Sequence, residues 1–431
     1  MKEANKQKMG MGSVILFGIN GIIGTGIFLL PSSGMKLFGP ASLLSLAFDG
    51  LLVCLIALCF AECAGLYGTN GGPYLYARGA FGNFVGYEVG FMTWVVRMIA
   101  EATLYVGFAT AVGGIFPVLN TPFAKNAMVT VLGIFLMLLN IAGVRLTTKL
   151  NDIMTVAKLV PLLLVALLGL FFLHPANFHP FFLPGKGSTA NFAQTTLTLF
   201  YVFSGFEGLV VAAGEMRNPK RNLPKALLIS LSAVVAIYML IMVACIGVLG
   251  SGLMQSTVPV QDALQRMVGE WGSVLVAAGT LCSIGGICVA SSFITPRSGE
   301  ALAEHQMMPA VLAKKNRWGA PYVAIIVSTV VGLLLAYTGS FAKLAMISAI
   351  SRFVQYIPTC LAVIVFRRTK PEAVRSFKLP FGPLIPLLAL AVSGWLLFHT
   401  PAENLLWGFG ALLIAVPFYF ITGRHADAEF S

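Results

Sequence analysis

Seven charged side chains lie within long apolar stretches of the 431-residue sequence. A charge at membrane depth costs at least ~2.5 kcal/mol, so each of these residues is a candidate functional group. They are Asp49, Glu62, Arg97, Glu101, Lys158, Glu207 and Arg352. Glu62 lies near the end of its stretch and is interpreted as structural. Asp49 lies shallow in its stretch and is interpreted as reaching solvent.

Lys158 is the most informative of these residues, because no acidic residue stands three or four positions away to neutralise it on the same helix. Desolvation penalises an ammonium group relative to the neutral amine. A buried lysine is therefore a candidate proton carrier near neutral pH. The structural alternative is a lysine that pairs with a distant acid or extends to the membrane interface. Neither interpretation requires a metal ion.

Two apolar stretches are interrupted by glycines. Residues 18–26 contain four glycines in nine residues, and residues 203–208 read FSGFEG. Each glycine inside a helix costs about 1 kcal/mol relative to alanine, so both clusters predict a weakened or broken helix. Paired interruptions in two halves of a chain are typical of inverted-repeat transporters, whose broken helices hold the substrate near the midplane. Small-residue packing faces on unbroken helices are the alternative.

The elements that carry these residues are predicted to be membrane-spanning helices. The chain is 58% hydrophobic and 10% charged, with a mean hydropathy of +0.87, which excludes an ordinary soluble protein. Twelve segments are long enough for a spanning helix, and none alternates in polarity as a barrel strand does. The fold class is therefore all-α. The expected spans are 12–31, 41–66, 84–117, 126–143, 151–173, 190–214, 225–250, 271–299, 321–338, 343–366, 381–398 and 403–422.

Basic residues between the spans predict the orientation of the chain. Of the 28 Lys and Arg residues, 20 fall on the face that holds both termini and three lie inside spans. The other face holds Lys36, Lys125, Lys186, Arg266 and Lys343. This bias places both termini in the cytoplasm and predicts a multi-pass protein of the cell membrane. The net charge of +12 forms no continuous stripe, so nucleic acid is not an expected partner.

Several motifs, in order along the chain, resemble those of the amino acid, polyamine and organocation (APC) transporter superfamily. They are 23–31 (IGTGIFLLP), 71–76 (GGPYLY) with 80–82 (AFG), 203–207 (FSGFE), Glu215 with 218–224 (NPKRNLP), and 304–309 (EHQMMP) ahead of Ala320 and Pro321. The resemblance runs from about residue 12 to about residue 422. It implies a LeuT-type fold, with a ten-helix core (12–366) built from inverted five-helix repeats (about 12–173 and 190–366). Two appended helices (381–422) and cytoplasmic tails (1–11 and 423–431) complete the expected organisation.

The resemblance also implies where an amino acid would bind. The break at Ile23 to Gly26 would free backbone N–H groups at the start of a half-helix, which favours an anion. In similar transporters the carboxylate binds at the positions of Thr25 and Gly26, and the amino group meets carbonyls at those of Ile23, Tyr201 and Ser204. Thr25 replaces the usual serine and keeps a hydroxyl. The expected binding residues of the two breaks are Ile23, Gly24, Thr25, Gly26, Tyr201, Ser204 and Phe206.

Arg97 and Glu101 share one face of a helix, since they are four residues apart. They either form an internal pair or line the pocket for the substrate's side chain, as the matching positions do in similar arginine/agmatine antiporters. Those positions are uncharged there, and Ile287 stands where those antiporters have an aromatic residue. An arginine/agmatine exchanger is therefore doubtful. A pocket at Arg97, Glu101 and Ile287 is expected to favour a polar or charged side chain.

The resemblance assigns coupling to Lys158 and Glu207. LeuT-type sodium transporters hold sodium near the position of Lys158, whereas some proton-coupled permeases and exchangers have lysine there. Glu207 is interpreted as a coupling or gating group and Arg352 as structural. We therefore expect a sodium-independent, proton-coupled secondary transporter that moves amino acids by alternating access. Proton-independent exchange of amino acids or amines is the alternative, and a membrane-embedded amino acid sensor is the alternative from another class.

An enzyme is not expected. An intramembrane hydrolase needs a nucleophile and a base at depth, but the histidines fall at span ends or in loops. These are His174, His179, His305, His399 and His425. The seven cysteines lie in apolar stretches without a CxxC pair and are expected to be small buried hydrophobes. We expect no cofactor and no metal. The expected partners are the amino acid, protons and the lipid bilayer; the oligomeric state stays open.

Overall fold

A computed structural model describes residues 10–67, 72–143, 148–211, 216, 218–304, 306–375 and 377–422. The described residues form helices and no strand, as the all-α prediction requires. The α-helices are α1 (Met11–Ile22), α2 (Thr25–Leu29), α3 (Pro31–Phe38), α4 (Ser42–Tyr67), α5 (Pro73–Phe81), α6 (Asn83–Ile115), α7 (Pro122–Ile141), α8 (Thr148–Gly169), α9 (Thr189–Phe200), α10 (Glu207–Val211), α11 (Pro219–Leu249), α12 (Pro259–Val268), α13 (Glu270–Glu304), α14 (Tyr322–Ala336), α15 (Phe341–Thr369), α16 (Leu384–Phe398) and α17 (Ala402–Thr422). Short 3-10 helices are η1 (Gly39–Ala41), η2 (Pro117–Leu119), η3 (Pro175–Phe178), η4 (Tyr201–Phe203), η6 (Gly250–Met254) and η7 (Ala310–Ala313).

Seven helical segments of the described chain are long and apolar enough to cross a membrane. They are Pro31–Tyr67, Asn83–Ile115, Pro122–Ile141, Arg221–Met254, Glu270–Glu304, Phe341–Thr369 and Ala402–Phe420. Four shorter apolar helical segments are Met11–Ile22, Lys158–Gly169, Tyr322–Ala336 and Leu384–Phe398. Several helices extend beyond the expected spans, because hydropathy marks the part suited to hydrocarbon whereas the backbone can stay helical outside it. The full count of twelve spans stays a prediction.

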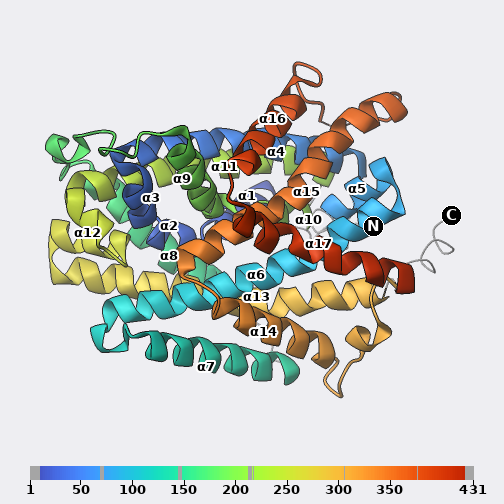
Figure 1. The fold of residues 1–431 in the computed structure, drawn as a ribbon, viewed down its shortest axis with the longest axis horizontal. Helices are drawn as coiled ribbons and strands as arrows, with labels where there is room; N and C mark the ends of the chain where they lie inside the picture. The colour runs from blue at the N-terminus through green and yellow to red at the C-terminus, as the bar shows by residue number, and fades with distance from the viewer. Residues whose placement is uncertain are drawn as a thin grey trace.

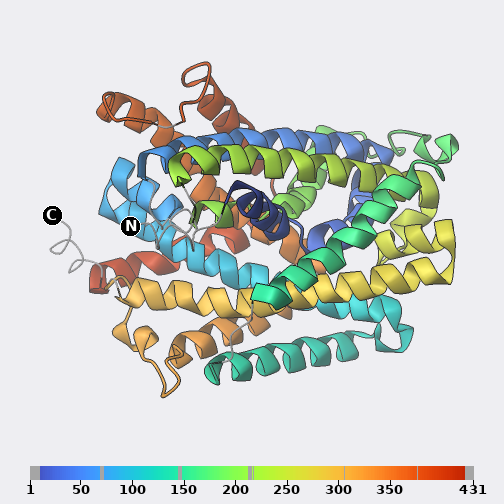
Figure 2. The ribbon, with the colours of Figure 1, turned by 180° about the vertical axis from the view of Figure 1, so that it is seen from behind.

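The helices pack around a short central one. Figure 2 shows α1 in the middle of the molecule, between the neighbouring α4 and α11 on one side and α6 and α13 on the other. Helix α6 also packs against α15 and α5, and α13 packs against α8. Helix α7 lies at the periphery beside α14 (Figure 1). The long helices therefore enclose α1 and α2 and place their chain break inside the bundle.

The two glycine-rich stretches coincide with interruptions of helical structure. Helix α1 ends at Ile22 and α2 begins at Thr25, while η4 ends at Phe203 and α10 begins at Glu207. The interruptions touch through their backbones, since a Cβ on Gly205 would lie 2.2 Å from the carbonyl oxygen of Gly21. Gly205 also has a φ of 114°, which side chains rarely allow. Glycine at position 205 therefore permits both the turn and the close approach.

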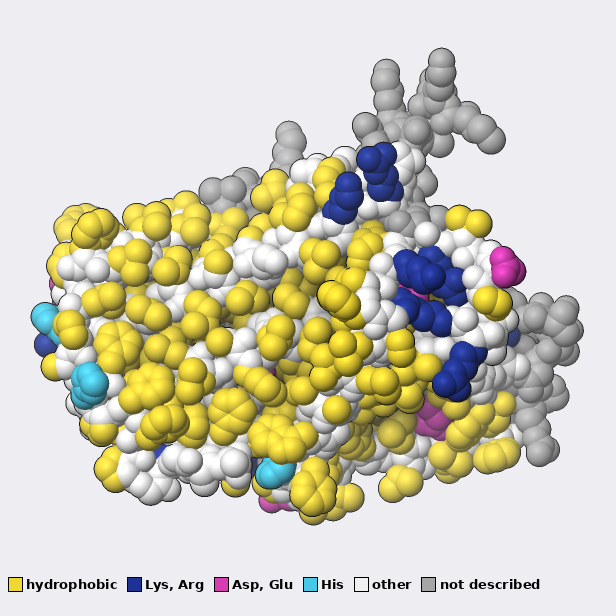
Figure 3. Space-filling view, turned by 90° about the horizontal axis from the view of Figure 1, so that it is seen from above, with side chains coloured by type: hydrophobic (Ala, Val, Ile, Leu, Met, Phe, Trp, Pro, Cys, Tyr) yellow, Lys and Arg dark blue, Asp and Glu magenta, His cyan; other side chains and the backbone are white. Residues whose placement is uncertain are grey.

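The outer surface is suited to lipid rather than water. Figure 3 shows a face dominated by hydrophobic side chains, with Lys and Arg gathered toward the side on which α15 and α17 end in Figure 1. Arg368 and Lys370 are exposed at the end of α15. Of the two expected tails, only Gly10 and Met11 belong to the described residues. The motif residues Gly71, Glu215 and His305 also lie outside the described residues.

Two expectations about buried residues are wrong. Asp49 on α4 does not reach solvent, because its side chain is completely buried. Cys282 on α13 is exposed rather than buried, and Cys54 on α4 is partly buried; the other five cysteines are buried. Hydropathy alone cannot tell which face of an apolar helix points inward, and this explains both errors.

Candidate functional site

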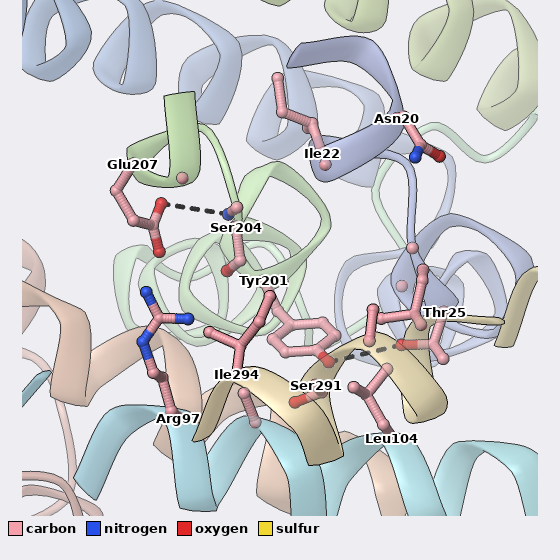
Figure 4. Close-up of a pocket in the computed structure, with 18 of the residues that line it drawn as sticks. Asn20, Ile22, Thr25, Arg97, Leu104, Tyr201, Ser204, Glu207, Ser291 and Ile294 are labelled. Atoms are coloured by element: carbon pink, nitrogen blue, oxygen red, sulfur yellow. Dashed lines mark hydrogen bonds between the residues drawn. The ribbon is translucent and has the colours of Figure 1, made fainter. Parts of the chain in front are cut away.

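A cavity of about 310 Å³ lies where the two helix interruptions meet the faces of α6, α13 and α15. Figure 4 shows side chains from the two interruptions, α6 and α13 converging on it. Nine of the twelve predicted site residues line the cavity: Gly24, Thr25, Gly26, Arg97, Lys158, Tyr201, Ser204, Glu207 and Ile287. Ile23, Glu101 and Phe206 are not among its lining residues.

Lys158 binds the carboxyl end of α1. Its Nζ donates hydrogen bonds to the carbonyl oxygens of Asn20 at 2.7 Å and Ile23 at 2.6 Å, and the side chain is 2% exposed. The hydroxyl of Tyr238 on α11 donates to the carbonyl of Ile22 at 3.2 Å. Carbonyls in the last turn of a helix lack intrahelical N–H partners, and Lys158 and Tyr238 supply donors at this helix end. An ammonium group also complements the negative end of the helix dipole.

The amino end of α2 faces the cavity. Gly24 is extended, with φ −124° and ψ −155°, and the helix begins at Thr25. Helical hydrogen bonds continue into α3, from Leu30 N–H to Gly26 at 2.8 Å and from Gly34 N–H to Leu30 at 3.0 Å. The first N–H groups of such a helix have no acceptor within it and favour an anion. The arrangement can therefore hold a carboxylate between α2 and the cavity.

The second interruption contributes polar groups from η4, from the segment that follows it and from α10. The hydroxyl of Tyr201 lies 3.4 Å from that of Thr25, so the two breaks meet through side chains as well as backbone (Figure 4). The hydroxyl of Ser204 is buried and has no hydrogen-bond partner in the described part of the chain. A polar ligand in the cavity could satisfy that hydroxyl.

Glu207 and Arg352 form a buried ion pair that the sequence analysis missed. Nη1 of Arg352, on α15, pairs with Oε1 of Glu207, on α10, and each residue is 8% exposed. The other carboxylate oxygen of Glu207 accepts the N–H of Gly205 at 3.1 Å and the hydroxyl of Tyr356 at 3.5 Å. The pair ties the second helix interruption to α15. The sequence indicated that each buried charge needs a partner, but it did not indicate that these two residues pair with each other.

Arg97 and Glu101 do not form an ion pair, although both lie on α6. Glu101 accepts a hydrogen bond from the hydroxyl of Tyr105, one turn further along α6, and stays outside the cavity lining. Arg97 instead points into the cavity from α6, toward the side of Glu207 and Ser204 (Figure 4). The structure therefore separates the two side chains that the sequence treated together.

Two apolar candidates are placed differently with respect to the cavity. Ile287 on α13 lines it opposite Gly24, where an added Cβ would stand 3.6 Å from Ile287 Cδ1. Phe206 is fully buried and packs its ring against those of Phe60 and Tyr356, with centroid distances of 5.5 Å in each case. Polar lining residues that the sequence analysis did not name are Asn20, Thr93, Ser283, Ser291 and Gln355. The only indication of these residues in the sequence was that they are polar and lie within apolar spans.

Glu62 and Asp49 lie outside the cavity lining. Arg367 binds both oxygens of Glu62, at 2.8 and 2.6 Å, and the backbone N–H of Leu379 donates to the same carboxylate at 2.8 Å. These bonds tie α4 to α15 and to the segment before α16, which agrees with a structural role for Glu62. Neither carboxylate oxygen of Asp49 has a hydrogen-bond partner among the described residues.

Comparison with known proteins gives one consistent result. Residues 9–422 match the family model described as amino acid permease. The chain is 31% identical to an uncharacterized transporter of Mycobacterium tuberculosis, over 90% of this chain and 86% of that protein. It is 27% identical to the branched-chain amino acid permease BcaP of Bacillus subtilis, over 98% of this chain and 94% of the relative. It is 26% identical to the serine/threonine exchanger SteT of the same species, over 92% and 91%.

Proposed function

We propose that this chain, which belongs to the amino acid permease family, is a secondary active amino acid transporter that works by alternating access. The observation that carries the proposal is the meeting of two interrupted helices at one cavity inside a multi-pass membrane protein. Such breaks place helix ends beside a substrate. The proposed architecture is LeuT-type, with twelve spans in a five-plus-five core and two appended helices. The basic residues Arg367, Arg368 and Lys370 at the end of α15 support cytoplasmic termini.

The proposed ligand contacts use backbone groups of both interruptions. The carboxylate would bind the N–H groups at Thr25 and Gly26, where α2 begins and the dipole favours an anion. The amino group would bind carbonyls at Ile23, Tyr201 and Ser204. The carbonyl of Ile23 already accepts from Lys158, but a carbonyl oxygen has a second lone pair for the ligand.

We propose that transport is independent of sodium, with Lys158 in place of the ion. Its ammonium group already occupies carbonyls at the end of α1, which a bound cation would otherwise coordinate. Loss of the proton would weaken these contacts and release α1, which couples proton movement to the change of state. The Glu207–Arg352 pair would act as a second, gating contact between α10 and α15. Proton-independent exchange is the alternative, and the serine/threonine exchanger among the relatives supports it.

Counterflow in proteoliposomes tests the proposal. Purified protein is reconstituted in sodium-free buffer, and each of the twenty amino acids is tested in radiolabelled form against the same unlabelled compound inside. At least one should show saturable counterflow. Analogues of that amino acid lacking the carboxylate or the amino group should compete about tenfold less well or worse, because each forfeits a set of charge-assisted hydrogen bonds. Absence of counterflow for all twenty, or equal competition by the decarboxylated amine, would contradict the proposal.

A further inference from the structure

The guanidinium group of Arg97 lies in the cavity without a counter-charge. No hydrogen bond or ion pair to Arg97 is present among the described residues, and its Nε is buried without a partner. Arginine stays protonated in proteins, so it cannot escape this cost by becoming neutral. Figure 4 shows the side chain extending from α6 into the cavity, with its guanidinium group on the side of Glu207.

The other charges of the cavity do not compensate Arg97. Glu207 is the only acidic lining residue among those described, and it is already bound to Arg352. Lys158 adds a further basic group, held at the end of α1. Glu101 is engaged by Tyr105 and does not line the cavity. The lining therefore carries more positive than negative charge, and Arg97 is the basic group with neither an acidic partner nor a carbonyl acceptor.

The position of Arg97 separates it from the proposed carboxylate site. Leu104 lies near Thr25 in Figure 4, and Arg97 lies toward the other end of the cavity. The two α6 residues are two helical turns apart, a rise of about 10 Å. From an α-carboxylate bound at Thr25, the side chain is the part of an amino acid that can extend along α6 toward Arg97. A guanidinium group binds a carboxylate through two parallel hydrogen bonds, which neutral or cationic side chains cannot reproduce.

We propose that the transported amino acids carry a second carboxylate on the side chain, which binds Arg97. This inference rests on the proposed amino acid transport and specifies its substrate class as acidic amino acids. A neutral side chain leaves Arg97 unpaired, and a cationic one is repelled by Arg97. The substrates in the names of the relatives are not acidic amino acids, so the inference comes from the cavity alone.

Competition by isosteric pairs tests the proposal. Binding of L-glutamate and L-aspartate is compared with that of L-glutamine and L-asparagine, using the purified protein and its thermal stabilisation by each compound as the readout. The acid of at least one pair should bind about tenfold more tightly than its amide, the magnitude of one charge-assisted contact. In Arg97→Gln this preference should fall to near unity while the amide still binds, and Arg97→Lys should keep part of it. Arg266→Gln removes the same charge from an exposed site on α12 and should keep the full preference.

The outcomes separate this inference from the proposed function. If no amino acid binds, amino acid transport itself is contradicted. If amino acids bind but amides bind as well as acids, or if Arg97→Gln keeps the preference, only the acidic substrate class is overturned. If Arg97→Gln does not fold, the comparison of acids with amides on the parent protein still tests the acidic substrate class.

Discussion

Replacing Lys158 by methionine removes the ammonium group while keeping a long apolar side chain of similar volume. Two carbonyl oxygens, those of Asn20 and Ile23, lose their donor at the end of α1. A buried carbonyl without a partner costs about 1–3 kcal/mol, so the loss at Ile23, with a smaller one at the partly buried Asn20, disfavours the conformation seen here by at least about 1–3 kcal/mol. The position is almost completely buried, which limits compensation by water.

An opposing effect limits the change in the free energy of unfolding. A buried ammonium group also carries a desolvation penalty of several kcal/mol, and Lys158→Met removes it. The two effects are of similar size, so the midpoint of thermal unfolding should change little. The response to protons should change completely, because methionine cannot bind one. A small effect on stability beside a large effect on coupling is the expected signature of Lys158→Met.

Uptake of the substrate identified by counterflow measures this effect. In sodium-free proteoliposomes the parent should take up more substrate under an inward proton gradient, and adding sodium should not increase uptake. Lys158→Met should show no response to the proton gradient but retain some counterflow. Lys314→Met, at an exposed loop position, should behave as the parent. Gradient-driven uptake that persists in Lys158→Met, or stimulation of the parent by sodium, would refute the reasoning.

Two further predictions concern the second helix interruption. Glu207→Gln and Arg352→Gln each leave one buried charge unpaired, and each should lower the free energy of unfolding by about 3–5 kcal/mol. In a double-mutant cycle measured by thermal unfolding, the double variant should lose less than the sum of the two single losses. Additive losses would show that the two residues are not coupled. Gly205→Ala should abolish counterflow or folding because its Cβ would lie 2.2 Å from the oxygen of Gly21, while Gly394→Ala, with no atom within 4 Å of its Cβ, should match the parent. Normal transport by Gly205→Ala would mean that the two interruptions do not need this contact.

Local sequence patterns predicted much of the fold but few of the partners. Apolar length predicts a helix because an unpaired backbone group is costly in hydrocarbon, and clustered glycines predict a break because they weaken helices locally. The partners of Lys158 were out of reach of such reasoning, since Ile23 is 135 residues away in the chain and the contact depends on how α1 and α8 pack. Only the absence of a local acid indicated that its partner was distant.

The spacing of Arg97 and Glu101 was misleading for a physical reason. Residues four apart on a helix share a face, but a helical side chain can turn toward other neighbours on that face. Glu101 meets the hydroxyl of Tyr105, which is also four residues away and could have been considered from sequence. Glu207 and Arg352 lie on different helices, and sequence spacing gives no information about such a pair.

The distribution of partners among the charges within the spans explains why Arg97 is expected to govern selectivity. Glu62, Glu207 and Arg352 are ion-paired, Lys158 is held by carbonyls, and Glu101 accepts from a tyrosine. Asp49 and Arg97 lack partners in the described part of the chain, as does Glu88 near the start of α6, which lies outside the cavity lining. A carboxyl group such as that of Asp49 can be neutralised by binding a proton, and Asp49 lies away from the cavity. A guanidinium group has no such escape, so the charge of Arg97 is best compensated by an anion that enters the cavity with the substrate.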